Sequence, residues 1–278
     1  IRVIPNATAL DGKLPLVLLS HGMFGNARNQ AWLAKELTAK GYIVAAIDHP
    51  GTSTFQKDPE HQRQLWERAN DITRSIDHVF ASETYGPLID QDRIFMGGHS
   101  LGGFTAMMLA GGRYDPEKMD GFCTDPDNQL VCGIFNRWNI AKTAEDRKTI
   151  AQDWSDQRIK AFAVFDLGGT QSFSPESLAN VKRPMLVYGA PITNSGLDLS
   201  IESHALVAAL PKANTKYIEP ATLAHFDFLG VCTPAAKDIL KEENPDDVMI
   251  CDQGTDERAQ KHQEIANQVD QFFSALWR

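Results

Sequence analysis

The stretch Gly97–Gly103, which reads GGHSLGG, decides the fold class of this chain. It follows the apolar run Ile94–Met96 and leads into a helical stretch at residues 101–110. Its inner part matches G-x-S-x-G, the signature of a strained strand-to-helix turn that exposes a serine. The glycines on either side provide the clearance that such a tight turn needs. We therefore expect Ser100 to be a nucleophile, in preference to the alternative of a serine that only caps a helix.

Apolar strand-like runs alternate with amphipathic stretches along the rest of the chain. Strands are expected at Leu16–Leu19, Tyr42–Ile47, Ile94–Met96, Ala161–Phe165, Met185–Tyr188 and Thr215–Ile218. Helices are expected at residues 29–39, 60–81, 101–110, 201–210 and 256–277. This alternation predicts an α/β fold with a mostly parallel central sheet and helices on both faces, in a single domain over residues 1–278.

One segment, residues 112–158, interrupts the alternation and is interpreted as an insertion. It places Phe135, Trp138 and Trp154 among polar residues, which argues against a disordered loop. We expect it to form a cap over the site. The three aromatic side chains are then candidates for a pocket wall, with the cap's own small core as the equal alternative.

A serine hydroxyl needs a base, and His225 is the candidate because it follows the last expected strand. The chain order of serine, acid and histidine that accompanies a G-x-S-x-G turn places the base there. Of the other histidines, His21 and His99 are expected to hold backbone or to line the site. His61, His78 and His262 are expected on solvated helix faces, His204 lies in the helix expected at 201–210, and His49 follows a strand too early in the chain.

The acid that orients this histidine has two candidates. Asp166 directly ends a strand, at the carboxyl edge of the sheet where reactive groups gather. Asp198 lies in the loop after the next strand, but it could simply cap the helix that follows. We prefer Asp166 and keep Asp198 as the alternative.

Acyl transfer also needs backbone N–H donors for a developing oxyanion. The amide after the nucleophile, that of Leu101, is one candidate, and that of Met23 in the early loop HGMFGN is the other. Phe24 in the same loop and His99 inside the turn are further candidates for the pocket lining.

Composition excludes several classes of function. The formal net charge is −9 and Lys and Arg form no block, which argues against nucleic-acid and anionic-membrane partners. The sequence contains no apolar run long enough for a transmembrane helix. The expected chemistry needs no metal and no organic cofactor, so we expect none.

Four cysteines form two local couples, Cys123 with Cys132 and Cys232 with Cys251. Disulfides in this sequential pairing are preferred over the other two pairings and over four buried thiols, because each couple closes a short polar loop. With the start at Ile1, which suggests a removed leader or a trimmed chain, the cysteines predict a periplasmic or secreted protein.

By its motifs the chain resembles the serine α/β-hydrolases, and among them the platelet-activating-factor acetylhydrolase and dienelactone-hydrolase-like group. The similar segments cover roughly residues 14–110 and 158–230: PLVLLSHGMFGNARNQAWLAKELTAKGYIVAAIDHPG, GGHSLGG, RIKAFAVFDLGG and HFDFL. The resemblance implies Ser100, Asp166 and His225 as the triad, with Met23 and Leu101 as oxyanion donors. A serine at position 100 does not imply dienelactone chemistry, for which that enzyme uses cysteine, and the long insertion departs from the acetylhydrolases.

The leading hypothesis is a carboxylic ester hydrolase that acts through an acyl-enzyme on a small-molecule ester. Its acyl group would be short or medium, with aromatic and lipid-like groups as further candidates. The alternative is an amidase or peptidase with the same triad. A third hypothesis, a catalytically inactive binding module, is weakened because both the serine and the histidine are present. Oligomeric state is not predicted.

Overall fold

The computed structural model describes residues 4, 8, 10–125, 129–192, 195–251 and 255–276, and its core is a six-stranded parallel sheet. The strand order is β2-β1-β3-β4-β5-β6, and every neighbouring pair runs parallel. The strands are β1 (Leu14–Ser20), β2 (Ile43–Ala46), β3 (Ile89–His99), β4 (Ile159–Phe165), β5 (Met185–Tyr188) and β6 (Thr215–Ile218). The α/β class and each strand expected from sequence are confirmed.

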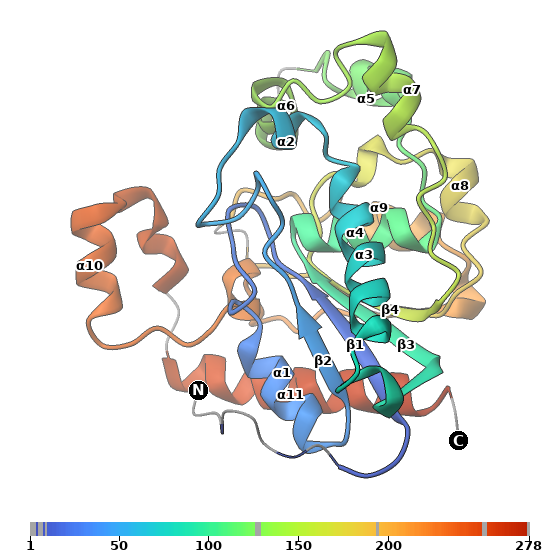
Figure 1. Ribbon diagram of the computed structural model, residues 1–278. Coiled ribbons are helices and arrows are strands. Elements are labelled where there is room, and N and C mark those ends of the chain that lie inside the picture. Colours follow the sequence, from blue (N-terminus) through green and yellow to red (C-terminus); the bar gives the residue numbers. More distant parts are fainter. Residues whose placement is uncertain are drawn as a thin grey trace.

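Helices cover both faces of the sheet. Successive residues of a strand point to opposite faces, and apolar side chains on both faces need cover. In β1, Leu16 and Leu18 face one core and Val17 and Leu19 face the other. The first core lies under α3 (Glu67–Ala81), α4 (Leu101–Ala110) and α9 (Ser203–Ala209). The second lies under α1 (Ala31–Ala39) and α11 (Thr255–Ser274), which run together beside the sheet (Figure 1).

The single helix expected at residues 60–81 is wrong, because the chain breaks there. It forms α2 (Pro59–Arg63), capped by the Asp58 side chain, and then α3. Gln64 leaves the helical conformation with φ −87° and ψ 55°, and Leu65 and Trp66 are buried before α3 begins. The apolar period that suggested one helix therefore includes residues buried in the connection.

The segment 112–158 forms helices α5 (Pro116–Phe122), α6 (Gln129–Arg137) and α7 (Ala144–Ile150), with residues 126–128 outside the described part. These helices lie together at one end of the molecule, with α2 beside them (Figure 1). An ion pair between Arg63 of α2 and Asp146 of α7 joins the two parts.

Both sequential disulfides are formed. Cys123 bonds Cys132, which joins the end of α5 to α6. Cys232 bonds Cys251 and closes the excursion that holds α10 (Ala236–Glu243) and the 3-10 helix η5 (Pro245–Cys251). The remaining helices are α8 (Pro175–Ala179), η1 (Gly86–Leu88), η2 (Thr170–Ser172), η3 (Lys212–Asn214) and η4 (His225–Phe228).

No helix in the described ranges is both long and apolar enough to span a membrane.

Candidate active site

Ser100 lies on the turn between β3 and α4 in a strained conformation, with φ 54° and ψ −119°. The flanking glycines are required by contact. A Cβ on Gly98 would lie 2.1 Å from the Gly102 carbonyl oxygen, and one on Gly102 would lie 2.0 Å from the Ser20 carbonyl oxygen. The turn therefore holds the serine outward at the N-terminus of α4, where backbone amides favour negative charge.

His225 begins the short helix η4, and Asp166 follows β4 directly. The Asp166 Oδ2 atom lies 2.7 Å from Nδ1 of His225, and both side chains are buried. Oδ1 of Asp166 accepts a hydrogen bond from the Ala190 amide at 3.0 Å. This leaves the second imidazole nitrogen of His225 for the cavity that Ser100 also lines.

The structure brings Asp166, and not Asp198, to the histidine. Asp198 is exposed, and its Oδ1 accepts hydrogen bonds from the Ser200 amide at 2.8 Å and hydroxyl at 2.7 Å. Its hydrogen bonds are thus local, but it does not cap the following helix, because α9 has Glu202 at its N-cap. Asp227 is also occupied, since Arg258 and Lys261 pair with its carboxylate.

The two candidate oxyanion donors lie beside Ser100. Gly22 passes so close that a Cβ on it would lie 3.2 Å from the Ser100 Cβ, which places the Met23 peptide next to the nucleophile. Neither the Met23 nor the Leu101 amide donates a hydrogen bond to any of the described residues. The neighbouring Phe24 amide is already bonded to the Thr52 carbonyl at 2.9 Å. Within the described ranges, both amides are therefore available as donors to an oxyanion formed at Ser100.

His99 does not act as a partner of its neighbour Ser100. Its Nε2 bonds the His225 carbonyl oxygen at 2.9 Å, and its ring lies 4.5 Å from that of His225. Burial lowers the pKa of His99 well below its ordinary value. This neutral imidazole supports the loop of the catalytic candidate His225 and lines the cavity.

His262 contradicts the expectation of a solvated histidine. It is buried, stacks on the Trp32 ring at 3.9 Å and bonds the Asp227 carbonyl oxygen at 2.7 Å. It precedes the buried Ile265 by three residues in α11, so it shares the helix face that packs on the sheet. Burial lowers the pKa of His262 to about 4.

The cavity at Ser100 has a volume of about 480 Å³. Phe24, His99, Phe135 and Trp138 line it, as the sequence predicted. Phe24 packs edge-on against Trp138 with ring centroids 5.6 Å apart. Phe135 and Trp138 also belong to the main core, so both interpretations of these aromatics apply.

Trp154 does not line the cavity, so for this side chain the alternative of a packing role applies. Its indole N–H donates to the Thr149 carbonyl at 3.2 Å, and its ring packs on the core at the far end of the insertion. The chain turns after α7 and runs back toward β4, which carries Trp154 away from α6 and the cavity.

One wall of the cavity was not predicted from the sequence. The excursion closed by Cys232–Cys251 contributes lining residues from and next to η5, namely Asn244, Asp246, Asp247, Met249 and Ile250. Apolar residues of α6 were also missed: Leu130, Val131 and Ile134. The helical spacing of the apolar residues in α6 was the signal that could have identified this part of the lining. The η5 wall is a polar loop, and nothing local marks it.

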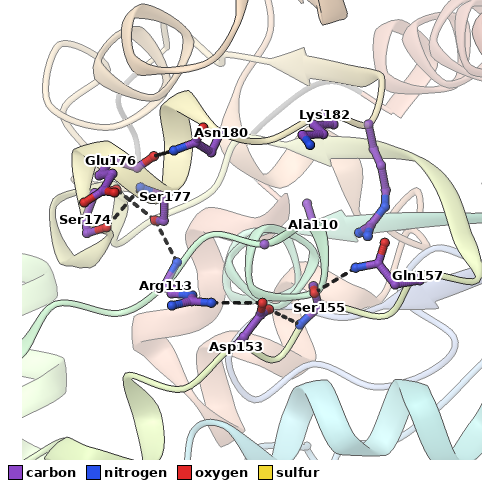
Figure 2. A pocket seen from close by; sticks show the side chains of 12 residues that line it. Ala110, Arg113, Asp153, Ser155, Gln157, Ser174, Glu176, Ser177, Asn180 and Lys182 are labelled. Atoms are coloured by element: carbon purple, nitrogen blue, oxygen red, sulfur yellow. Dashed lines mark hydrogen bonds and ion pairs between the residues drawn. The ribbon is translucent and has the colours of Figure 1, made fainter.

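A second cavity, of about 670 Å³, lies at the C-terminal end of α4 (Figure 2). Its side chains mostly bond one another, as Arg113 does with Asp153 at 3.1 Å and Gln157 with Ser155 at 3.1 Å. Among the described residues that line it, none is a histidine. Although larger, it lacks a nucleophile with a base, so the smaller cavity is the candidate active site.

Glu202 is a buried carboxyl close to the triad. Its Oε2 accepts the amides of Gly169 at 2.9 Å and Thr170 at 2.8 Å, in the turn that follows Asp166. Burial raises the pKa of Glu202 to about 7, with a further contribution from the Asp166 charge. Glu202 thus holds the backbone behind the acid.

Parts of the chain are similar to known hydrolases. Residues 13–124 match a family model described as serine aminopeptidase, S33. Cutinase 1 of Thermobifida cellulosilytica is 32% identical over 101 residues, which is 36% of this chain and 35% of that protein. Hydrolase LUC6 of Fusarium is 25% identical over 82% of this chain and 55% of its own length. The chain therefore spans only part of the curated relatives that it matches.

Among solved structures, a ferulic acid esterase from Streptomyces cinnamoneus superposes with a TM-score of 0.60 at 20% identity. The match covers 95% of this chain and 67% of the esterase, and it establishes the fold. Together with the sheet order and the turn at Ser100, this match shows that the chain has the α/β-hydrolase fold.

Proposed function

We propose that this protein hydrolyses carboxylic esters of small molecules through an acyl-enzyme on Ser100. The observation that carries the proposal is the buried Asp166–His225 pair, joined at 2.7 Å, in the same cavity as a serine on a strained turn. A serine, a base and an orienting acid are the parts that nucleophilic acyl transfer requires.

In the proposed reaction the Ser100 hydroxyl attacks the ester carbonyl carbon while His225 takes its proton. Asp166 keeps the Nδ1–H tautomer of His225 and stabilises the imidazolium. The amides of Met23 and Leu101 donate to the tetrahedral oxyanion. The imidazolium then protonates the leaving alcohol, and a water molecule, activated by the same histidine, releases the acid and restores Ser100.

The apolar side chains of α6, with Phe24 and Trp138, support an acyl group of short or medium length, with aromatic or lipid-like groups as further candidates. The similarity to proteins named cutinase supports ester cleavage. We also propose that residues 112–158 act as a cap within one domain of residues 1–278, since α6 contributes lining residues to the cavity.

The proposed subgroup is that of the platelet-activating-factor acetylhydrolases and dienelactone-hydrolase-like proteins. The position of Asp166 directly after the strand that follows the nucleophile helix supports it. We expect the protein to cleave an acetyl glycerophospholipid as fast as a simple acetate ester. Turnover of the simple ester alone would remove the subgroup and leave the reaction in place.

We further propose a periplasmic or extracellular location. Two disulfides support it, since such bonds persist in oxidising compartments. Fractionation of the source cells tests this: the protein is expected outside the cytosol, with both disulfides intact, and a reduced cytosolic form would contradict it.

The alternative function is an amidase or peptidase, which the family model described as a serine aminopeptidase supports. The same histidine can protonate an amine leaving group, so the triad serves either reaction.

A panel of nitrophenyl esters with increasing acyl length, each beside the matched nitroanilide, separates the two reactions. We expect ester turnover that vanishes in Ser100→Ala, with the anilides much slower. Faster turnover of the anilides would establish the alternative. Absence of both reactions, with no fluorophosphonate adduct on Ser100, would instead indicate a binding module.

A further inference from the structure

Arg68 of α3 is a charged side chain buried beneath the loop that carries Met23, with 2% of its surface exposed. Its guanidinium donates to four neutral oxygens. These are the Thr105 hydroxyl at 3.0 Å, the Thr52 hydroxyl at 2.6 Å, the Ser20 hydroxyl at 3.3 Å and the His21 carbonyl. Three separate segments of the chain thus meet at this side chain: residues 20–21, Thr52 and Thr105.

Three of the four acceptor residues, His21, Thr52 and Thr105, are connected to the candidate oxyanion donors. The His21 carbonyl lies two residues before Met23, and the Thr52 carbonyl accepts the Phe24 amide at 2.9 Å, just after it. The Thr105 hydroxyl donates to the Leu101 carbonyl at 3.0 Å. Arg68 therefore holds both sides of the Met23 peptide and also the first turn of α4.

A second set of hydrogen bonds supports the same loop, which carries Met23. Asp71 bonds Nδ1 of His49 at 2.9 Å, and Nε2 of His49 bonds the Ser20 hydroxyl at 2.8 Å. The His49 amide donates to Nε2 of His21 at 3.0 Å. Although this row has the residue types of a triad, Ser20 is fully buried and meets no substrate.

The charge state of this network is steady at neutral pH. Burial lowers the pKa of Arg68 to about 9, so the guanidinium remains protonated. Burial, with the nearby Arg68, lowers the pKa of His21 to about 2, so this ring stays neutral. A buried cation costs free energy that an apolar side chain of similar size would avoid, so a role in stability alone does not account for it.

We propose that Arg68 is a positioning residue for the oxyanion site: its guanidinium fixes the Met23 and Leu101 amides relative to each other. This inference rests on the proposed function. It explains why a helix remote from the cavity supplies a fully buried arginine to the loop. Misplacing a catalytic group by about 1 Å can cost about 100-fold in rate. Loss of the Arg68 guanidinium is therefore expected to weaken stabilisation of the transition state.

The test compares Arg68→Gln with Arg158→Gln, measured per active site after fluorophosphonate titration. Arg158 also binds α3, through the Thr73 carbonyl at 3.3 Å and the Asp77 carboxylate, so it contacts that helix farther along than Arg68, and it also pairs with Asp156. For a nitrophenyl ester we expect Arg68→Gln to lower kcat about 100-fold with KM within about threefold. The affinity for a trifluoromethyl ketone, whose adduct carries an oxyanion, is expected to fall in parallel, and Arg158→Gln is expected to change neither.

Thr52→Val and Thr105→Val remove one acceptor each and keep Arg68, so they serve if Arg68→Gln does not fold. Each is expected to lower kcat about tenfold, with the same fall in ketone affinity. An unchanged kcat in the folded variants, or equal losses in Arg158→Gln, would overturn the inference. If the wild-type protein itself neither turns over esters nor reacts at Ser100, it is the proposed function that fails.

Discussion

At the scale of single residues, the site is built on backbone that is costly to form. Phe24, Ser100 and Asp166 all have positive φ, at 53°, 54° and 45°. Each such conformation in a residue with a side chain costs about 1–3 kcal/mol, and it persists where surrounding contacts enforce it. The three residues belong respectively to the oxyanion loop, the nucleophile turn and the acid.

The acid is the residue whose assignment mutation tests best. Asp166→Asn is expected to lower kcat by about 10⁴-fold, because the amide favours the wrong imidazole tautomer of His225. Asp198→Asn is the matched control, and it is expected to leave kcat within about twofold, since that carboxylate is exposed and its hydrogen bonds go to the nearby Ser200. Steady-state ester kinetics measures both. The reverse order of losses would contradict the assignment.

Glu202 gives a prediction for pH. Its folded-state pKa is raised from 4.5 to about 7, so the folded protein holds this proton more tightly than the unfolded chain does. The stabilisation is complete below pH 4.5 and is lost as the pH rises through about 7, by up to about 3 kcal/mol in total. In Glu202→Gln this loss is expected to be absent.

Denaturant unfolding at a series of pH values measures this difference. Glu176→Gln, on the exposed surface of α8, is the control and is expected to follow the wild-type curve. Identical pH dependence in the wild type and Glu202→Gln would show that the buried carboxyl does not titrate in this range.

At the scale of elements, the inner strands could be predicted well from the sequence because they are buried on both faces. Continuous apolar runs such as Met185–Tyr188 mark such strands directly, and β5 has those bounds. Helix boundaries were less predictable. Leu65 and Trp66 continue the apolar pattern of α3 but are buried in a connection, and His262 is polar yet lies on the buried face of α11.

The cavity walls depend on the disulfides. Cys132 belongs to α6 and Cys251 ends η5, and each of these elements lines the cavity. In the chain-entropy account, each short loop is worth about 3 kcal/mol of stability. Removing Cys232–Cys251 by a double change to serine is therefore expected to lower the free energy of unfolding by about that amount.

The same variant is expected to change substrate preference. KM for long acyl esters should rise several-fold as the η5 wall loosens, while kcat for a nitrophenyl acetate, which leaves most of the cavity empty, should change little. Parallel kinetics over an acyl series measures this. Equal KM values for the wild type and the variant across the series would show that η5 does not contact the substrate.

At the scale of the whole molecule, the site assembles because a parallel sheet brings the carboxyl ends of its strands to one edge. This rule allowed Ser100, Asp166 and the Met23 loop to be grouped from sequence, and His225 by chain order. The rule does not predict which segments from other parts of the chain cover this edge of the sheet. The η5 wall and the Arg68 network come from segments whose local sequence resembles an ordinary loop and an ordinary helix.

The central claim is that Ser100 carries the acyl group. The most direct measurement is rapid acid quenching during turnover of a nitrophenyl butyrate, followed by peptide mass spectrometry. The account predicts a burst of nitrophenol stoichiometric with enzyme and a butyryl group on the peptide that contains Ser100, both absent in Ser100→Ala. Full turnover by Ser100→Ala, or a butyryl group on another residue, would contradict it.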